Sequence, residues 1–255
     1  MNKNELGINL FVCGMFLVHG LISRPFSSDK EKDSVDLVNR LLLLGMLFWL
    51  IAMANSSTAL VTLILGSGML VIAHLSAGTR RLVYVGGVGV LLLGILGNAF
   101  GFGEGGYSLV GRDQSLTGRT DLWADLLGVQ INPILGTGFR SFWLGSRAEY
   151  FWDKYYFHPV QAHNGYLETY LNVGIIGVCL LIGLIVSSGL RLGKEMFVGG
   201  SIRILQLTLL IVAVVYNWTE ALFNSSTLLW FTLLISVMKV QNVAANGLHP
   251  VGSER

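Results

Sequence analysis

Two arginines and a histidine stand in three short segments between residues 116 and 168, and their side chains suit chemistry on an anionic substrate. Arg119 belongs to the first segment, Arg140 to the second and His163 to the third. A guanidinium group donates two parallel hydrogen bonds to phosphate oxygens and stays charged at any physiological pH. A histidine titrates nearest to neutrality, so it can accept a proton as a general base. These three residues are therefore the first candidates for a functional site.

The composition indicates the environment in which these residues act. The chain has 255 residues, of which 53% are hydrophobic and 13% are charged, whereas a soluble domain is about 25% charged. A globule of this length cannot bury so much apolar surface. A soluble enzyme, a disordered tail and a disulfide scaffold are therefore excluded. The net charge of +2 argues against a nucleic-acid partner, and the sequence has no metal-ligand spacing, so we expect neither a metal site nor a cofactor.

Apolar runs predict an all-α polytopic membrane protein with about seven transmembrane helices, because about 20 apolar residues cross a bilayer. The second and last runs are short, but their flanks can extend the helix to the interface. Asn55, Ser56 and Ser57 predict a turn between the second and third runs. We expect one membrane domain over residues 1–255, with spans near 6–22, 41–54, 58–75, 82–100, 169–190, 204–222 and 227–238.

Lysine and arginine residues in the loops predict the orientation. The loops 23–40, 76–81 and 191–203 carry them, whereas the turns at 55–57 and 223–226 carry none. The basic loops and the carboxyl-terminal tail should therefore face the cytoplasm. The segment 101–168, between the fourth and fifth helices, should face outward. Met1 then lies outside as well, so either upstream helices are missing or the first run does not fully cross.

The outward segment 101–168 carries the chemistry in this interpretation. It is far longer than any other loop, and long ordered loops are usually functional. We expect short amphipathic helices in it, one of which includes residues 116–123 and ends before Asn132. The segment is also rich in aromatic side chains that suit packing on a bilayer surface or on a sugar, namely Trp123, Trp143, Tyr150, Trp152, Tyr155, Tyr156 and Phe157.

Three motifs occur in a fixed order around this loop. They are Thr-Gly-Arg followed by Trp (residues 117–123), Leu-Gly-x-Gly-Phe followed by Phe-Trp (135–143), and His-Asn-x9-Gly-x-x-Gly (163–177). Together they resemble the O-antigen ligase and polymerase superfamily, and the wording Ala-His-Asn-Gly-Tyr-Leu-Glu (162–168) is most similar to its exopolysaccharide-polymerase branch. The resemblance covers roughly residues 41–240. Members usually carry several more amino-terminal helices, so the chain resembles a carboxyl-terminal part or a shortened relative.

The resemblance implies a fold similar to the C-type glycosyltransferases and an inverting, metal-independent transfer. The donor would be a glycan on a polyprenyl diphosphate, and the acceptor a sugar hydroxyl at the outer side of a bacterial inner membrane. A polymerase would join lipid-linked repeat units into exopolysaccharide or O-antigen, whereas a ligase would move finished glycan to lipid A core or to a protein. A non-catalytic truncated subunit is a third interpretation. Membrane lipids and other polysaccharide-assembly proteins are the further partners that the resemblance implies.

The resemblance also implies roles for the two motif arginines. Arg119 and Arg140 would stabilise the negative charge that develops on the departing diphosphate. The alternatives are an ion pair of Arg119 with Asp121 or Asp125, and cation–π packing of Arg140 on Trp143. Two other arginines of the loop, Arg112 and Arg147, lie outside the motifs, and we expect them to be solvated.

The acceptor hydroxyl must lose a proton, and His163 would be the general base or a contact to the diphosphate. The alternative is a histidine bonded to a backbone carbonyl. Asn164 can cap the fifth helix, whose first amides favour an anion. Glu220, at the outward end of the sixth helix, could be the base, could orient His163 or a loop arginine, or could be an interfacial carboxylate in water.

The aromatic residues in or beside the motifs complete the candidate substrate site. Trp123, Trp143 and Tyr166, with Asn164, are candidates for sugar binding, although such rings also form interfacial belts. Gly174 and Gly177 share a helical face, and we expect them to let a neighbouring helix approach closely.

Overall fold

The computed structural model describes residues 3–23, 30–100, 113–198, 200–223 and 225–238. The regular elements in these ranges are nine α-helices, together with an isolated bridge between Asn132 and Gly136. The helices are α1 (Lys3–Ile22), α2 (Lys30–Ala54), α3 (Ser57–Leu75), α4 (Ala77–Phe100), α6 (Asp113–Gly128), α7 (Ser146–Lys154), α8 (Gly165–Glu195), α9 (Ser201–Tyr216) and α10 (Leu228–Val237). The predicted all-helical class is confirmed.

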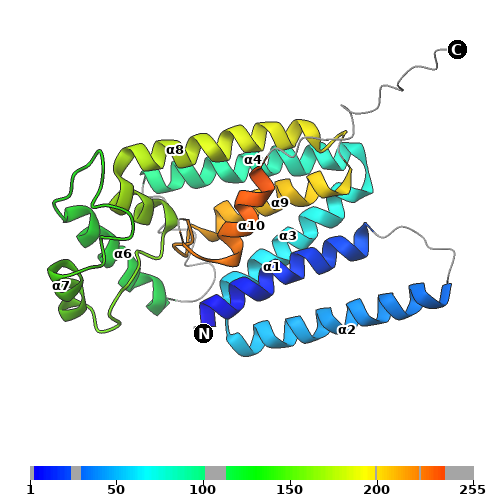
Figure 1. The fold of residues 1–255 in the computed structure, drawn as a ribbon, viewed down its shortest axis with the longest axis horizontal. Coiled ribbons are helices and arrows are strands. Elements are labelled where there is room, and N and C mark those ends of the chain that lie inside the picture. Colours follow the sequence, from blue (N-terminus) through cyan, green and yellow to red (C-terminus); the bar gives the residue numbers. More distant parts are fainter. Residues whose placement is uncertain (1–2, 24–29, 101–112, 199, 224, 239–255) are drawn as a thin grey trace, which may run out of the picture.

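The helix α9 is the centre of a bundle that includes α1, α3, α4, α8 and α10 (Figure 1). Apolar side chains are buried almost all round α9, which is the pattern of a core helix. The helix α2 packs on the outside, against α1 and α3. Four helices of the described chain are long and apolar enough to cross a membrane, namely Asn4–Ile22, Lys32–Ala54, Ser57–Leu75 and Gly165–Glu195. The protein is therefore an integral membrane protein.

Each of the seven predicted runs coincides with a helix, and two boundaries differ most. The second helix begins at Lys30, and Arg40 pairs with Asp36 one turn earlier at 2.9 Å, so charged residues continue the helix beyond the apolar run. The sixth helix ends at Tyr216 instead of residue 222. Its end is fixed by Asn217, whose side-chain oxygen accepts hydrogen bonds from the backbone N–H groups of Leu222 and Phe223 at 2.8 and 2.9 Å. Glu220 therefore lies in a turn and not on a helix, contrary to the prediction.

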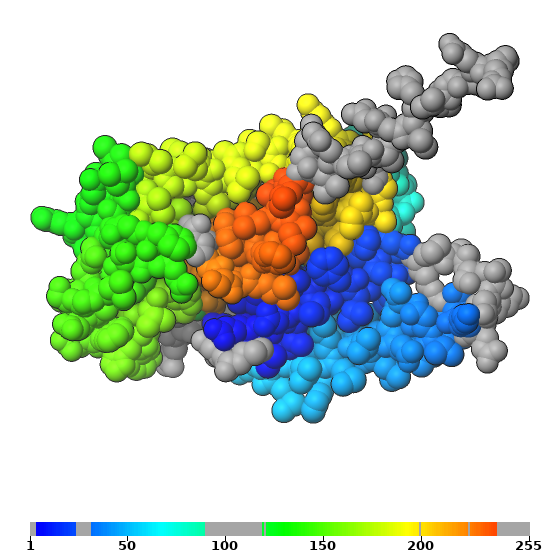
Figure 2. All heavy atoms as spheres, viewed as in Figure 1, coloured from blue at the N-terminus to red at the C-terminus, as the bar shows by residue number. Residues whose placement is uncertain are grey.

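The helices α6 and α7 and the loops around them form a separate lobe at one end of the bundle (Figures 1 and 2). We call this lobe the α6–α7 unit. The expected helix through residues 116–123 is present as α6, which ends before Asn132. The unit has a small apolar core of its own, made by Leu122, Leu126, Phe142, Phe151, Ala162 and Leu171.

A break in α8 at Gly174 joins this unit to the bundle. Gly174 has φ 66° and ψ −165°, so the helix is interrupted there. The N–H groups of Thr137 and Gly138 donate to the freed carbonyls of Leu171 and Asn172 at 3.0 and 2.9 Å. In return, the N–H groups that follow the break donate to the loop: Ile175 to Pro133 at 2.9 Å and Ile176 to Ile134 at 3.4 Å. Backbone hydrogen bonds that α8 loses are thus replaced by bonds to the loop 133–138.

The glycines of two motifs are required by this close approach. A Cβ atom on Gly174 would overlap the carbonyl oxygen of Ile134, and one on Gly136 would lie 2.5 Å from the carbonyl carbon of Asn172. The expectation that Gly174 and Gly177 admit a neighbouring helix is therefore wrong. The element that approaches Gly174 is a loop backbone, and a Cβ on Gly177 would meet Val173 of the same helix.

We expect Gly174→Ala to detach the loop 133–138 and to destabilise the protein by at least about 1–3 kcal/mol, because alanine is strained at positive φ and collides with Ile134. Gly183→Ala, in the same helix with open space around its Cβ position, is the matched control and should be neutral or slightly stabilising. Thermal unfolding in detergent measures both variants. Equal melting temperatures for the two would contradict this account of the break.

Candidate active site

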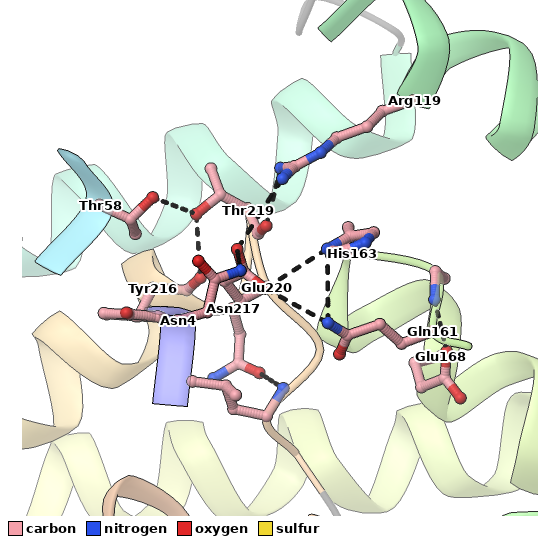
Figure 3. Close-up of polar contacts among 12 residues, drawn as sticks. Asn4, Thr58, Arg119, Gln161, His163, Glu168, Tyr216, Asn217, Thr219 and Glu220 are labelled. Carbon is pink, nitrogen blue, oxygen red and sulfur yellow. Dashed lines mark hydrogen bonds and ion pairs between the residues drawn. The ribbon is translucent and has the colours of Figure 1, made fainter. Parts of the chain in front are cut away.

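The carboxylate of Glu220 lies at the centre of a polar cluster where the α6–α7 unit meets the bundle (Figure 3). Its side chain is only 6% exposed. Four polar side chains surround it, those of Asn4 at the start of α1, Arg119 on α6, and Gln161 and His163 in the segment before α8. We call these five residues the Glu220 cluster.

The two carboxylate oxygens of Glu220 have different partners. The side-chain amide of Asn4 donates to Oε1 at 3.0 Å, and Nη2 of Arg119 lies 3.8 Å from the same oxygen. Nδ1 of His163 and Nε2 of Gln161 each lie 3.4 Å from Oε2. Arg119 is held further by a 2.9 Å hydrogen bond from Nη1 to the carbonyl of Thr219. The carboxylate thus separates a guanidinium side from an imidazole side.

The start of α8 carries His163 to this carboxylate. As predicted, Asn164 caps the helix, because its side-chain oxygen accepts hydrogen bonds from the N–H groups of Tyr166 and Leu167 at 3.0 and 3.2 Å. The N–H of Gly165 donates to the carbonyl of Asn217 at 2.8 Å, and there is no room for a side chain at Gly165. This hydrogen bond holds the first turn of α8 against the end of α9. The last residue of α9, Tyr216, precedes Glu220 by four residues.

His163 has a backbone conformation that side chains seldom adopt. Its φ is 51°, in the left-handed region, which non-glycine residues occupy only where the surroundings impose it. The neighbouring N–H of Ala162 is held by a 2.8 Å hydrogen bond to Oε2 of Glu168. A constrained backbone on both sides of His163 thus directs the imidazole toward Glu220.

Glu168 connects the loop that carries Trp143 to the segment before α8, and the sequence alone gave this residue no role. Its carboxylate accepts hydrogen bonds from Nε1 of Trp143 at 3.0 Å, from the N–H of Ala162 and from Nδ2 of Asn172 at 2.9 Å. The signal that could have found it is a carboxylate in the first turn of a helix that directly follows the candidate histidine. Its partners, however, come from segments whose proximity only the fold reveals.

Arg140 lies at a neighbouring cavity of about 300 Å³ and not in the Glu220 cluster. Its side chain is exposed, its φ is 55°, and no described residue forms a hydrogen bond or ion pair with its guanidinium group. Trp143, Gln161 and Glu168 line the same cavity. Because Gln161 also contacts Glu220, the cavity adjoins the Glu220 cluster.

Two alternatives for the arginines do not occur in the described chain. Arg119 contacts Glu220 and forms an ion pair with neither Asp121 nor Asp125. Asp125 is paired with Lys154 at 2.6 Å. Among the described arginines of this loop, Arg147 and not Arg140 covers an aromatic ring, because its guanidinium carbon lies 5.5 Å from the centre of the Phe142 ring.

The expectation that Arg147 is solvated is wrong. Its Nη2 donates to the carbonyl of Ser141 at 3.2 Å, and its side chain is partly buried. A guanidinium that both donates to a backbone carbonyl and covers an aromatic ring supports the fold of this loop. Arg112 lies outside the described residues.

The aromatic candidates occupy three different environments. Nε1 of Trp123 donates to the carbonyl of Ala162 at 2.7 Å, and the ring packs on the core of the α6–α7 unit. Tyr166 donates to the carbonyl of Val214 at 3.2 Å and packs edge-on against Phe223. Trp143, which Glu168 orients, lines the cavity beside Arg140.

The comparisons with known proteins identify the family of this chain. The O-antigen ligase family matches residues 41–182, and the chain belongs to that family. The resemblance found in the motifs is therefore confirmed. Arg119, Arg140 and His163 fall inside the matched range, whereas Asn4 and Glu220 fall outside it.

The chain is also similar to the "Exopolysaccharide production protein ExoQ" of Rhizobium meliloti, strain 1021. The two are 30% identical over 139 residues, which are 48% of this chain and 29% of the relative. The match thus spans less than a third of that relative's length. No solved structure gives a significant match.

The ion pair of Asp125 and Lys154 predicts that the stability of the α6–α7 unit depends on pH. Lys154, followed by the Tyr155 hydroxyl, lowers the pKa of the Asp125 carboxyl below its ordinary value. A lowered pKa stabilises the fold above the unfolded-state pKa, and this contribution is lost as the pH falls through the folded-state pKa. We therefore expect faster amide hydrogen exchange in α7 below about pH 4, after correction for the intrinsic exchange rate.

Asp125→Asn is the control for this prediction. The variant should lose the acid-dependent change in α7 and should exchange faster already at pH 7. An acid response that persists unchanged in Asp125→Asn would show that another group causes it.

Proposed function

We propose that this protein is a glycan polymerase of the exopolysaccharide or O-antigen type. It transfers an oligosaccharide from a polyprenyl diphosphate onto the acceptor sugar of another lipid-linked repeat unit. The observation that carries the proposal is the meeting of Arg119 and His163, which belong to two different family motifs, at the buried carboxylate of Glu220. The name of the exopolysaccharide production protein that resembles this chain favours the same substrate class.

In this mechanism His163 is the general base. With Nδ1–H donated to Oε2 of Glu220, the other ring nitrogen, Nε2, has a free lone pair that takes the proton of the acceptor hydroxyl. Glu220 fixes the tautomer and balances the positive charge that forms on the imidazole, as carboxylates do in other histidine-dependent sites. Glu220 is then a positioning residue, and His163 touches the substrate.

The arginines act on the leaving group. As the acceptor oxygen bonds to the anomeric carbon, the bond to the diphosphate breaks from the opposite face, its electron pair stays on the diphosphate, and the configuration is inverted. Arg119 has five N–H donors, of which the Nη1 donor to Thr219 is engaged. The remaining donors, with the unengaged guanidinium of Arg140, bind the departing phosphate oxygens in the place of a metal ion. Trp143 stacks on a sugar in the adjoining cavity. Trp123, Asn164 and Tyr166 hold the backbone around the site through their hydrogen bonds.

We further propose that seven helices cross the bacterial inner membrane, in an arrangement similar to the C-type glycosyltransferases. The segment 101–168 is then the periplasmic catalytic loop of a single membrane domain. Basic residues such as Arg80 and Lys194 lie at the bundle end opposite to the Glu220 cluster, which supports this orientation. Other polysaccharide-assembly proteins are the partners that we expect at the periplasmic surface.

A ligase that transfers finished glycan to lipid A core or to a protein is the second candidate, favoured by the description of the matched family. It uses the same donor and the same residues, so the acceptor separates the two functions. Purified protein in vesicles that contain only the lipid-linked repeat unit should form longer chains. Transfer only after addition of lipid A core would favour the ligase, and no transfer to any acceptor would favour a non-catalytic subunit.

Arg119→Lys should lose most of the activity, about 100-fold or more, although the charge is retained. A lysine cannot reach Thr219, Glu220 and a phosphate at once, because it lacks the planar fork. Polymer yield in a strain that depends on this protein for the polymer measures the effect. Arg81→Lys at the other end of the bundle is the control, and equal yields from the two variants would refute the role of Arg119.

His163→Ala should abolish transfer while the protein remains in the membrane at a normal level. The imidazole supplies the base, and general-base catalysis typically contributes a factor of about 100–10,000. His158→Ala removes an exposed histidine of the same loop and should be near neutral. Normal chain lengths in His163→Ala would rule out the mechanism.

The orientation is tested by a cysteine at Ser146, which is exposed at the start of α7. In a background with Cys13 and Cys179 replaced by alanine, intact cells should label Ser146→Cys with a membrane-impermeant maleimide. Labelling only after lysis would reverse the topology and remove the active site from the periplasm.

A further inference from the structure

The start of α4 and the end of α8 lie at the end of the bundle away from the Glu220 cluster (Figure 1). Residues of these two helices line an apolar groove. Its volume is about 410 Å³. Val85 on α4 and Leu190 on α8 form its walls, and both side chains are more than half exposed at the surface of the bundle. At its rim stand two cations, Arg81 and Lys194.

The floor of the groove is fixed by tight packing. Tyr84 lies directly over Gly193, and a Cβ atom on that glycine would overlap the tyrosine ring. The two helices therefore approach each other through one aromatic ring. The groove lies beside this contact between α4 and α8.

The basic residues at this end of the bundle divide into two groups. Arg80 donates to the carbonyl of Ala73, Arg191 donates to the carbonyl of Val237, and Arg203 pairs with Glu195 at 3.3 Å. The side chains of these three residues therefore already have partners within the protein.

Arg81 and Lys194 form the second group. Neither has a hydrogen bond or ion pair with another described residue, and both line the groove. Two uncompensated cations beside an apolar channel are complementary to a ligand with a negative head and an apolar tail.

We infer that this groove binds one anionic phospholipid of the surrounding membrane. Its phosphate group lies between Arg81 and Lys194, and one acyl chain runs along Val85 and Leu190. A free phosphate could use the cations but not the apolar walls, and a zwitterionic lipid could use the walls but carries an ammonium group toward the cations. Basic pockets between transmembrane helices bind anionic headgroups by this combination. The site is independent of the glycan-transfer reaction.

The test uses the full chain, purified in detergent and exposed to equal amounts of phosphatidylglycerol and phosphatidylethanolamine. Native mass spectrometry counts the lipids that stay bound, and thermal unfolding measures stabilisation by each lipid. We expect preferential retention of phosphatidylglycerol, and the Arg81→Gln/Lys194→Gln variant should bind it about fivefold more weakly for each cation removed. Lys194→Arg, which keeps the charge, should retain the lipid.

The matched control is Arg80→Gln/Arg203→Gln, which removes the same charge at the same end without touching the groove. It should keep the preference for phosphatidylglycerol. The inference is overturned if both double variants lose the lipid equally, if the wild type retains the two lipids equally, or if inorganic phosphate alone gives the same stabilisation. Folding of each variant is checked by its unfolding transition in detergent without lipid.

Discussion

The buried carboxylate of Glu220 needs charged and hydrogen-bonding partners, and this requirement organises the end of the protein that carries the candidate site. Burying an isolated carboxylate costs several kcal/mol, and the charge is tolerated only when paired and hydrogen-bonded. Glu220 obtains its partners from α1, from α6 and from the segment before α8. Its position after α9 therefore ties together elements that are distant in the sequence. The same constraint brings a guanidinium and an imidazole to opposite sides of one carboxylate, an arrangement suited to an anionic leaving group and a proton acceptor.

A second constraint, the exchange of backbone hydrogen bonds at Gly174, keeps the α6–α7 unit in register with the bundle. Hydrogen bonds that a continuous α8 would make within itself are made instead with the loop 133–138. The loop then presents Arg140 and Trp143 to the cavity that adjoins Gln161. Glu168 links this loop to the backbone beside His163. Gly136 and Gly174 thus allow the loop to pack against α8, and Glu168 ties the loop to the segment before α8. Together these residues fix the loop that carries Arg140 and Trp143 relative to His163.

The sequence predicted the parts of this structure that depend on local pattern. Apolar runs located the helices, and Asn164 was predicted to cap α8 because its side chain suits that position. The role of Glu168 and the contact of Asn4 with Glu220 could not be predicted, because they depend on segments that only the fold brings together. Gly174 was misinterpreted since a glycine in an apolar helix has the same pattern whether a helix or a loop approaches it. Arg140 was expected beside the other candidates, but it lies on the adjoining cavity.

The central claim is that His163 and Glu220 act as one unit, and a double-mutant cycle tests it most directly. Transfer rates would be measured for Glu220→Gln, His163→Gln and the double variant, with the lipid-linked repeat unit as substrate in vesicles. Residues that act together are strongly non-additive. The account predicts that the double variant is no slower than His163→Gln alone. Losses that multiply in the double variant would mean that the two side chains act independently, which would contradict the account.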